Sequence, residues 1–283
     1  MTKQLPQDQY VRVGEIRTRY WAMGDGKSTV ILLHGLGRYI EQWEDNIEAL
    51  AQNRRVYALD LVGAGCSDKP HVIYSIPYLT EFLHKFMSVL GIERATLIGS
   101  SLGGAIAMQF AIQFPVQVEK LVLSGSAGLG KEVSVYLRIY ALPIIGEVFG
   151  GPSRKGSAEL MSQLFYDKGL ITDRLIDTDY EMSSLPGAQY STLSALRSYV
   201  NIWGARNDAY RPILDHLQEI QAPVLLIWGD HDNILPVAHA QRAVKKLPNA
   251  RLQIFETCGH APNIECAKKF NVVVNEFLSE GST

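Results

Sequence analysis

The stretch Ala95-Thr96-Leu97-Ile98-Gly99-Ser100-Ser101-Leu102-Gly103-Gly104-Ala105 decides the fold of this chain. Its first four residues have the character of a short buried strand, and residues 102–114, rich in small and apolar side chains, have that of a helix. Between them stands Gly-x-Ser-x-Gly, with Ser101 at its centre. A serine in a tight strand-to-helix turn takes strained backbone angles, so its neighbours two positions away must be small. The stretch therefore predicts a strand, a sharp turn that presents Ser101, and a helix.

Short apolar strands and amphipathic helical runs alternate along the rest of the chain. Two early strands are expected to pair as an antiparallel hairpin at the sheet edge, whereas the others alternate with helices, which is typical of a mostly parallel sheet covered on both faces. We therefore predict an α/β fold with a doubly wound, eight-stranded sheet. Its strands are expected at residues 10–13, 16–21, 29–33, 55–59, 95–98, 118–123, 223–228 and 251–255, with helices at 76–90, 102–114 and 263–278.

Strand signals disappear between residues 128 and 216, where helical stretches rich in Leu, Ile, Tyr, Phe and Met take over. We predict that residues 1–127 and 217–283 form one core and that residues 128–216 form a helical cap inserted into it. Such insertions lie above the carboxyl ends of the strands, where ligands bind in sheets of this type. The residues expected to contact the substrate are Gly35 and Ser100 near the turn, Tyr136, Ile139 and Tyr140 in the cap, and Leu235.

The composition argues against several classes of function. The net charge is −2 and the basic residues are scattered, so no nucleic-acid surface is expected. No apolar run reaches the roughly 18–20 residues that span a bilayer. Neither a metal-ligand motif nor a dinucleotide-binding glycine motif is present, so we expect no metal and no cofactor. Three cysteines and a polar opening favour the cytoplasm. We expect a monomer or homodimer that acts on a small molecule, an ester or a ketone.

A serine hydroxyl is a poor nucleophile until a base takes its proton, so a histidine and an orienting acid should accompany Ser101. His260 follows the last expected strand and precedes the closing helix, at the same sheet edge as Ser101. Two aspartates, Asp230 and Asp232, follow the strand at residues 223–228. The loop residue Asp232 has the reach toward the histidine, whereas Asp230 is expected to cap the turn. We therefore predict Ser101 as nucleophile, Asp232 as orienting acid and His260 as base.

An oxyanion formed by attack on a carbonyl needs hydrogen-bond donors. The backbone N–H of Leu102, directly after the nucleophile, is the first expected donor. The second should come from His34-Gly35-Leu36-Gly37, after the strand at residues 29–33, and we predict the N–H of Leu36. His34 is expected to fix the turn beside this loop.

Five motifs in this order resemble those of the α/β-hydrolase superfamily: HGLG at 34–37, LDLVGAGCSDKP at 59–70, GSSLGG at 99–104, WGDHD at 228–232 and CGHAPNIE at 258–265. The resemblance covers the whole predicted core and implies the same three catalytic residues. Within that superfamily the chain is most similar to the meta-cleavage-product hydrolases, which break a carbon–carbon bond in dienoate ring-fission products. Segments 125–130 and 165–172 add to this similarity.

The chain also departs from that family at three places. The family usually carries Asn at the position of Ser100 and Trp at that of Ala261, and it holds the substrate carboxylate with a cap arginine. The acidic residues 177–181 lie in the region of that arginine. Without a cation, an anionic dienoate would lose its charge-assisted hydrogen bonds, although Arg174 or Arg197 could substitute.

These departures favour ester cleavage. The main prediction is a serine hydrolase, like a carboxylesterase, that cleaves carboxylic esters with an apolar acyl or alcohol part through an acyl-enzyme on Ser101. Carbon–carbon cleavage of the meta-cleavage type is the alternative. A ligand receptor on the same fold is a third hypothesis.

Overall fold

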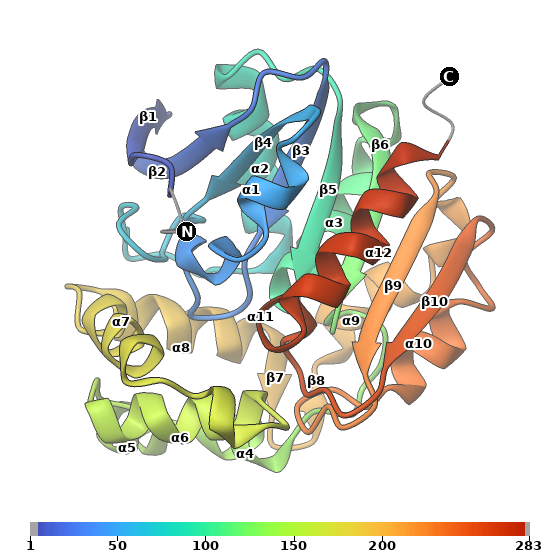
Figure 1. Ribbon diagram of the computed structural model, residues 1–283. Coiled ribbons are helices and arrows are strands. Elements are labelled where there is room, and N and C mark those ends of the chain that lie inside the picture. The colour runs from blue at the N-terminus through green and yellow to red at the C-terminus, as the bar shows by residue number, and fades with distance from the viewer. Residues whose placement is uncertain (1–4, 281–283) are drawn as a thin grey trace.

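The computed structural model describes residues 5–280 and contains one eight-stranded sheet (Figure 1). The strand order is β1-β2-β4-β3-β5-β6-β9-β10, with β2 antiparallel to both β1 and β4 and all other pairs parallel. The predicted fold class and strand number are therefore confirmed. The strands are β1 Gln9–Val13, β2 Ile16–Met23, β3 Ser28–Leu33, β4 Arg54–Leu59, β5 Ala95–Ser100, β6 Val118–Ser124, β9 Val224–Gly229 and β10 Ala250–Phe255.

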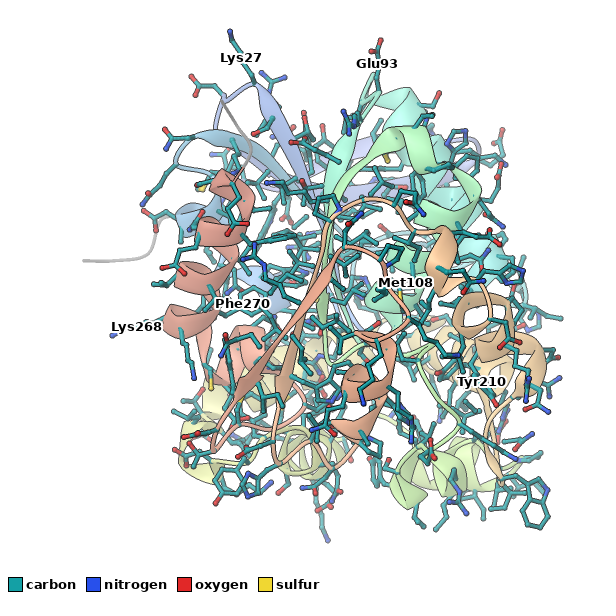
Figure 2. The ribbon with its side chains drawn as sticks, turned by 90° about the vertical axis from the view of Figure 1, so that its right-hand side faces the viewer. Lys27, Glu93, Met108, Tyr210, Lys268 and Phe270 are labelled. Carbon is teal, nitrogen blue, oxygen red and sulfur yellow. The ribbon has the colours of Figure 1, made fainter. Side chains whose placement is uncertain are left out.

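Helices cover both faces of this sheet. Figure 2 shows Phe270 of α12 and Met108 of α3 on opposite sides of the strands, and both side chains are fully buried. Neighbouring residues of β5 contribute to different cores, Leu97 on the α3 face and Ile98 on the α12 face. Burial on both faces explains why the parallel strands are continuous apolar runs. The covering helices are α1 Ile47–Leu50, α2 Ile76–Val89, α3 Leu102–Gln113, α9 Asn207–Leu214, α10 Ala238–Ala243 and α12 Ala267–Ser279.

The segment between β6 and α9 is mostly helical and lies beyond the carboxyl ends of the strands, at the bottom of Figure 1. Its helices are α4 Val135–Tyr140, α5 Ile145–Phe149, α6 Arg154–Leu164, α7 Asp173–Ser183 and α8 Ala188–Tyr199. We use "cap" for residues 128–216. The division of the chain at residues 128 and 216 stays a prediction. Just before the second boundary, α9 contacts both α8 of the cap and α3 of the core.

Three local features differ from the sequence expectations. Two short antiparallel strands, β7 Val200–Asn201 and β8 Gly204–Ala205, follow α8, where no strand was expected. The closing helix is divided into α11 Pro262–Glu265 and α12, because Cys266 takes φ −118° and ψ 35°, outside the helical region. In the described part of the chain, four 3₁₀ turns connect other elements: η1 Ile40–Trp43, η2 Pro115–Gln117, η3 Lys168–Leu170 and η4 Leu217–Glu219. Within residues 5–280, no helix has the length and hydropathy that a membrane span requires.

Candidate active site

Ser101 lies in a strained turn between β5 and α3. Its backbone takes φ 52° and ψ −115°, which is unusual for a residue with a side chain. A Cβ atom on Gly103 would lie 2.2 Å from the carbonyl oxygen of Leu33, and one on Gly99 would lie 2.4 Å from the backbone of Gly103. Both contacts are too short for any side chain. The two glycines of the motif are therefore required by the close packing of this turn, as the sequence predicted.

His260 and Asp232 meet at the carboxyl edge of the sheet. The imidazole Nδ1 of His260 lies 2.8 Å from Oδ2 of Asp232, and both side chains are almost completely buried. The other carboxylate oxygen of Asp232 accepts the backbone N–H groups of Ile234 (2.8 Å) and Leu235 (2.9 Å). This arrangement fixes the carboxylate and favours the tautomer with the proton on Nδ1, which leaves Nε2 to act as a base.

Asp230, the rival acid, has other partners. It accepts the backbone N–H of Cys258 at 3.3 Å, and its Oδ1 lies 2.6 Å from Nδ1 of His231. These contacts keep it at the end of β9, where the sequence expectation placed a residue that caps the turn. Of the two aspartates, the structure brings Asp232 to His260.

The loop that carries His260 is joined to the cap. The backbone N–H of His260 donates to the carbonyl of Leu164 at 2.7 Å. Glu265 accepts the N–H of Gly259 at 2.7 Å with one oxygen, and with the other it accepts those of Tyr166 (3.0 Å) and Asp167 (2.8 Å). Glu265 was missed as a site residue, although it closes the motif at residues 258–265. Its carboxylate fixes the histidine loop and cap residues 166–167 to each other.

The predicted oxyanion donors stand on two elements that meet at Ser101. Leu102 is the first residue of α3, where the helix dipole and the free N–H groups favour negative charge. Leu36 belongs to the loop after β3, which passes close to the nucleophile, since a Cβ on Gly35 would lie 3.2 Å from the Cβ of Ser101. The geometry supports the proposal that Leu36 and Leu102 donate to an oxyanion.

His34 fixes the start of this loop. Its Nε2 accepts the backbone N–H of Leu61 at 3.0 Å, so Nδ1, which lies 2.8 Å from the carbonyl of Gly35, carries the proton and donates. Burial lowers the pKa of His34 to about 4. A neutral imidazole thus links the loop after β3 to the segment after β4, which agrees with its expected structural role.

We expect His34→Gln to change how stability depends on pH. Folded His34 binds fewer protons than the unfolded chain between pH 6.5 and about 4. Its stabilisation is therefore complete above pH 6.5 and is lost as pH falls toward 4, by about 3 kcal/mol. Urea unfolding should show the free-energy difference between wild type and variant shrinking by this amount from pH 7 to pH 4.

Asp60 offers a control whose effect on stability should depend on pH in the opposite direction. Burial raises the pKa of Asp60 to about 6, so the contribution of Asp60 to stability is lost as pH rises through 6. The difference in unfolding free energy between wild type and Asp60→Asn should therefore shrink as pH rises, whereas that for His34→Gln shrinks as pH falls. A pH-independent difference between wild type and His34→Gln would contradict the role assigned to His34.

Ser101 borders two small cavities. The first, which we call the catalytic chamber, has about 60 Å³ and is lined by Ser101 and His260 together with the predicted contact residues Gly35 and Ser100. The second has about 30 Å³, has largely apolar walls and includes Leu235 next to Ser101. Three of the predicted substrate contacts therefore line the cavities that Ser101 borders.

The other three, Tyr136, Ile139 and Tyr140, line a larger cavity of about 290 Å³ under the cap, which we call the cap cavity. Ser101 is not among the described residues that line it. The cap cavity nevertheless adjoins the catalytic chamber, because four residues line both: Leu36, Arg38, Leu137 and Leu160.

Arg38, one of these shared residues, was not predicted from the sequence. Its Nη1 donates to a carboxylate oxygen of Asp179 in α7, and both side chains are buried. Its Nη2 lies 3.4 Å from the hydroxyl of Tyr39. The available signal was a basic residue directly after the HGLG motif, and its partner lies in the acidic stretch at residues 177–181.

The two arginines that could substitute for the family's cap arginine lie away from both cavities. Arg174 is 65% exposed and pairs with Glu44, and Arg197 binds Glu147 and two cap carbonyls. Neither is among the described residues of the catalytic chamber or the cap cavity. Across residues 5–280, no cluster of three or more His, Cys, Asp or Glu side chains has an arrangement that could hold a metal ion.

Comparison with known proteins agrees with this architecture. A family model described as alpha/beta hydrolase fold matches residues 28–141 and 154–266. A 2-hydroxy-6-oxo-2,4-heptadienoate hydrolase of Pseudomonas putida is 31% identical over 274 residues, which cover 95% of each chain. A 2-hydroxy-6-oxononadienedioate/2-hydroxy-6-oxononatrienedioate hydrolase of Paraburkholderia phymatum is 31% identical, covering 94% of this chain and 92% of the relative. Among solved structures, a mutant of the meta-cleavage product hydrolase CumD of Pseudomonas fluorescens, complexed with acetates, gives a TM-score of 0.83 at 29% identity, with 98% of this chain and 99% of that chain covered.

Proposed function

Since the chain belongs to the alpha/beta hydrolase fold family, we propose that it is a serine hydrolase in which Ser101 attacks a carbonyl carbon. The strained turn at Ser101 and the hydrogen bond between His260 and Asp232 support these roles. The N–H groups of Leu36 and Leu102 are proposed to stabilise the oxyanion.

Hydrolysis of a carbon–carbon bond next to a ketone is the first candidate reaction. The relatives described above are named for dienoates or meta-cleavage products, which favours this alternative over the ester expected from the sequence. In the structure, one observation carries it: the buried guanidinium of Arg38 borders the chamber that holds Ser101 and His260. The missing cap arginine was one of three departures that favoured an ester, and Arg38 weakens that argument because it offers charge-assisted hydrogen bonds to a carboxylate.

The proposed steps use residues of this chain alone. His260 Nε2 takes the hydroxyl proton of Ser101 as Oγ bonds to the ketone carbon, and the carbonyl oxygen becomes the oxyanion. The substrate reacts as its keto tautomer, in which the proton of the 2-hydroxyl group has moved to the carbon beside the ketone. When the carbon–carbon bond breaks, its electron pair moves into the leaving enolate, and His260 returns the proton to that group. A water molecule, deprotonated by His260, then attacks the acyl-enzyme. The acid leaves, and the proton returns to Ser101.

Ester hydrolysis is the second candidate, and a different observation favours it. Asp179 already pairs with Arg38, which makes the pair neutral, and most other side chains of the catalytic chamber are apolar. A neutral, largely apolar site suits an uncharged ester with an apolar part. The steps would be the same, except that His260 would protonate a leaving alcohol.

The two reactions can be separated with two substrate series. We expect the purified protein to consume 2-hydroxy-6-oxo-2,4-heptadienoate, followed by loss of its absorbance, with a kcat/KM at least about tenfold above that for any nitrophenyl ester of increasing acyl length. Fast ester turnover without dienoate turnover would instead establish the second candidate. No turnover of either, together with a Ser101 that resists a fluorophosphonate probe, would contradict both and favour the receptor hypothesis.

We propose that the protein is a cytoplasmic monomer or homodimer. The three free cysteines, Cys66, Cys258 and Cys266, support a reducing compartment such as the cytoplasm. Light scattering in solution would distinguish the predicted monomer from the predicted homodimer.

A further inference from the structure

The ion pair between Arg38 and Asp179 lies where the catalytic chamber and the cap cavity adjoin. Arg38 comes from the loop after β3 and Asp179 from α7, 141 residues further along the chain. Arg38 lines both the catalytic chamber and the cap cavity, and Asp179 lines the cap cavity. Apart from His260, no other His, Lys, Arg, Asp or Glu is among the described residues that line these two cavities. The pair therefore controls the charge that a substrate meets.

The pairing leaves the guanidinium only partly used. A guanidinium has five N–H donors in a planar fork. In Arg38, Nη1 donates to a carboxylate oxygen of Asp179, and Nη2 makes a longer hydrogen bond to the hydroxyl of Tyr39. The fork could bind a second carboxylate, but the charge of Asp179 stands beside it. An anionic substrate would have to displace that carboxylate or tolerate it as a neighbour, and like charges in contact disfavour binding. An uncharged substrate has no such cost.

We infer that Arg38 is the anion-binding residue of this site and that Asp179 competes with the substrate for it. Asp179 thereby sets how strongly the site discriminates against substrates that carry a carboxylate near the reacting carbonyl. This inference rests on the proposed function, because it takes the catalytic chamber to be the place where the carbonyl binds. It identifies Asp179 as a specificity-determining residue.

A purely mechanical role makes a different prediction. If the pair only tied α7 to the core, loss of Asp179 would destabilise the cap and weaken all ligands alike. The useful readout is therefore the ratio of affinities for an anionic and a neutral ligand of the same shape. Hexa-2,4-dienoate and hexa-2,4-dienamide form such a pair, since a carboxylate and an amide are nearly isosteric.

The affinities of both ligands would be measured by calorimetry in a Ser101→Ala background, where no turnover takes place. We expect Asp179→Asn to tighten dienoate binding at least about tenfold and to change amide binding less than about twofold. Adding Arg38→Met should abolish the gain. Asp177→Asn is the matched control, because Asp177 lies on the same helix and pairs with exposed Arg154.

Equal changes for both ligands in Asp179→Asn, or a gain that persists without Arg38, would overturn the inference. If Asp179→Asn does not fold, as judged by circular dichroism, Asp179→Ser removes the same carboxylate and gives the same test. Because binding is measured without catalysis, the outcome is independent of whether Ser101 cleaves a carbon–carbon bond, an ester or neither.

Discussion

Ser101→Ala is expected to lower kcat for the preferred substrate by about 10⁴- to 10⁶-fold. The alanine removes the atom that bonds to the carbonyl carbon, and no neighbouring group can replace it in the strained turn. Steady-state kinetics would measure the loss, and thermal unfolding would check that the variant keeps its fold. Since the methyl group of alanine fits where the hydroxymethyl group fitted, we expect little change in stability.

Ser100→Ala is the matched control for this prediction. Ser100 belongs to the same motif and lines the same catalytic chamber, but it is buried and is the last residue of β5. Its loss should reduce kcat/KM less than about tenfold, through substrate contacts alone. If Ser101→Ala kept a tenth of the wild-type activity, or if Ser100→Ala lost more than Ser101→Ala, the nucleophile would have to be reassigned.

Asp232→Asn is expected to lower kcat about 10³- to 10⁴-fold. The asparagine can keep the N–H groups of Ile234 and Leu235 bonded through its carbonyl oxygen. Its NH₂ group would then face Nδ1 of His260 and favour the wrong tautomer, with the proton on the nitrogen that should act as base. The measurement is kcat as a function of pH, with hydrogen exchange as a check on local order.

Asp230→Asn provides the comparison, because Asp230 stands two residues away and contacts His231 and Cys258 in place of His260. We expect it to change kcat less than about tenfold. A larger loss in Asp230→Asn than in Asp232→Asn would show that Asp230, and not Asp232, is the orienting acid.

The sequence was most informative where structure is local. The strand before Ser101 and the helix after it lie close to their predicted positions. Over about twenty residues, the hydrophobic periodicity, the small residues and the motif of the sharp turn all indicate the same local structure. The break at Cys266 was missed, since residues 263–278 carry a continuous helical pattern. Likewise, two-residue strands such as β7 and β8 are too short to produce a period.

Contacts made by the cap could not be predicted. The pair of Arg38 and Asp179 joins positions far apart in the chain, and it depends on where α7 packs against the core. The sequence indicated acidic residues in the cap, but it could not show that one of them meets a buried arginine at the catalytic chamber. The contact of Leu164 with His260 has the same origin.

The bonds of Glu265 have a consequence for how a substrate reaches the site. Residues 164–167 are attached to the loop of His260, so a movement of these residues away from the core would either break the hydrogen bonds or displace the base from Ser101. Substrate entry therefore keeps the base in position only if residues 164–167 and the histidine loop stay together as one unit.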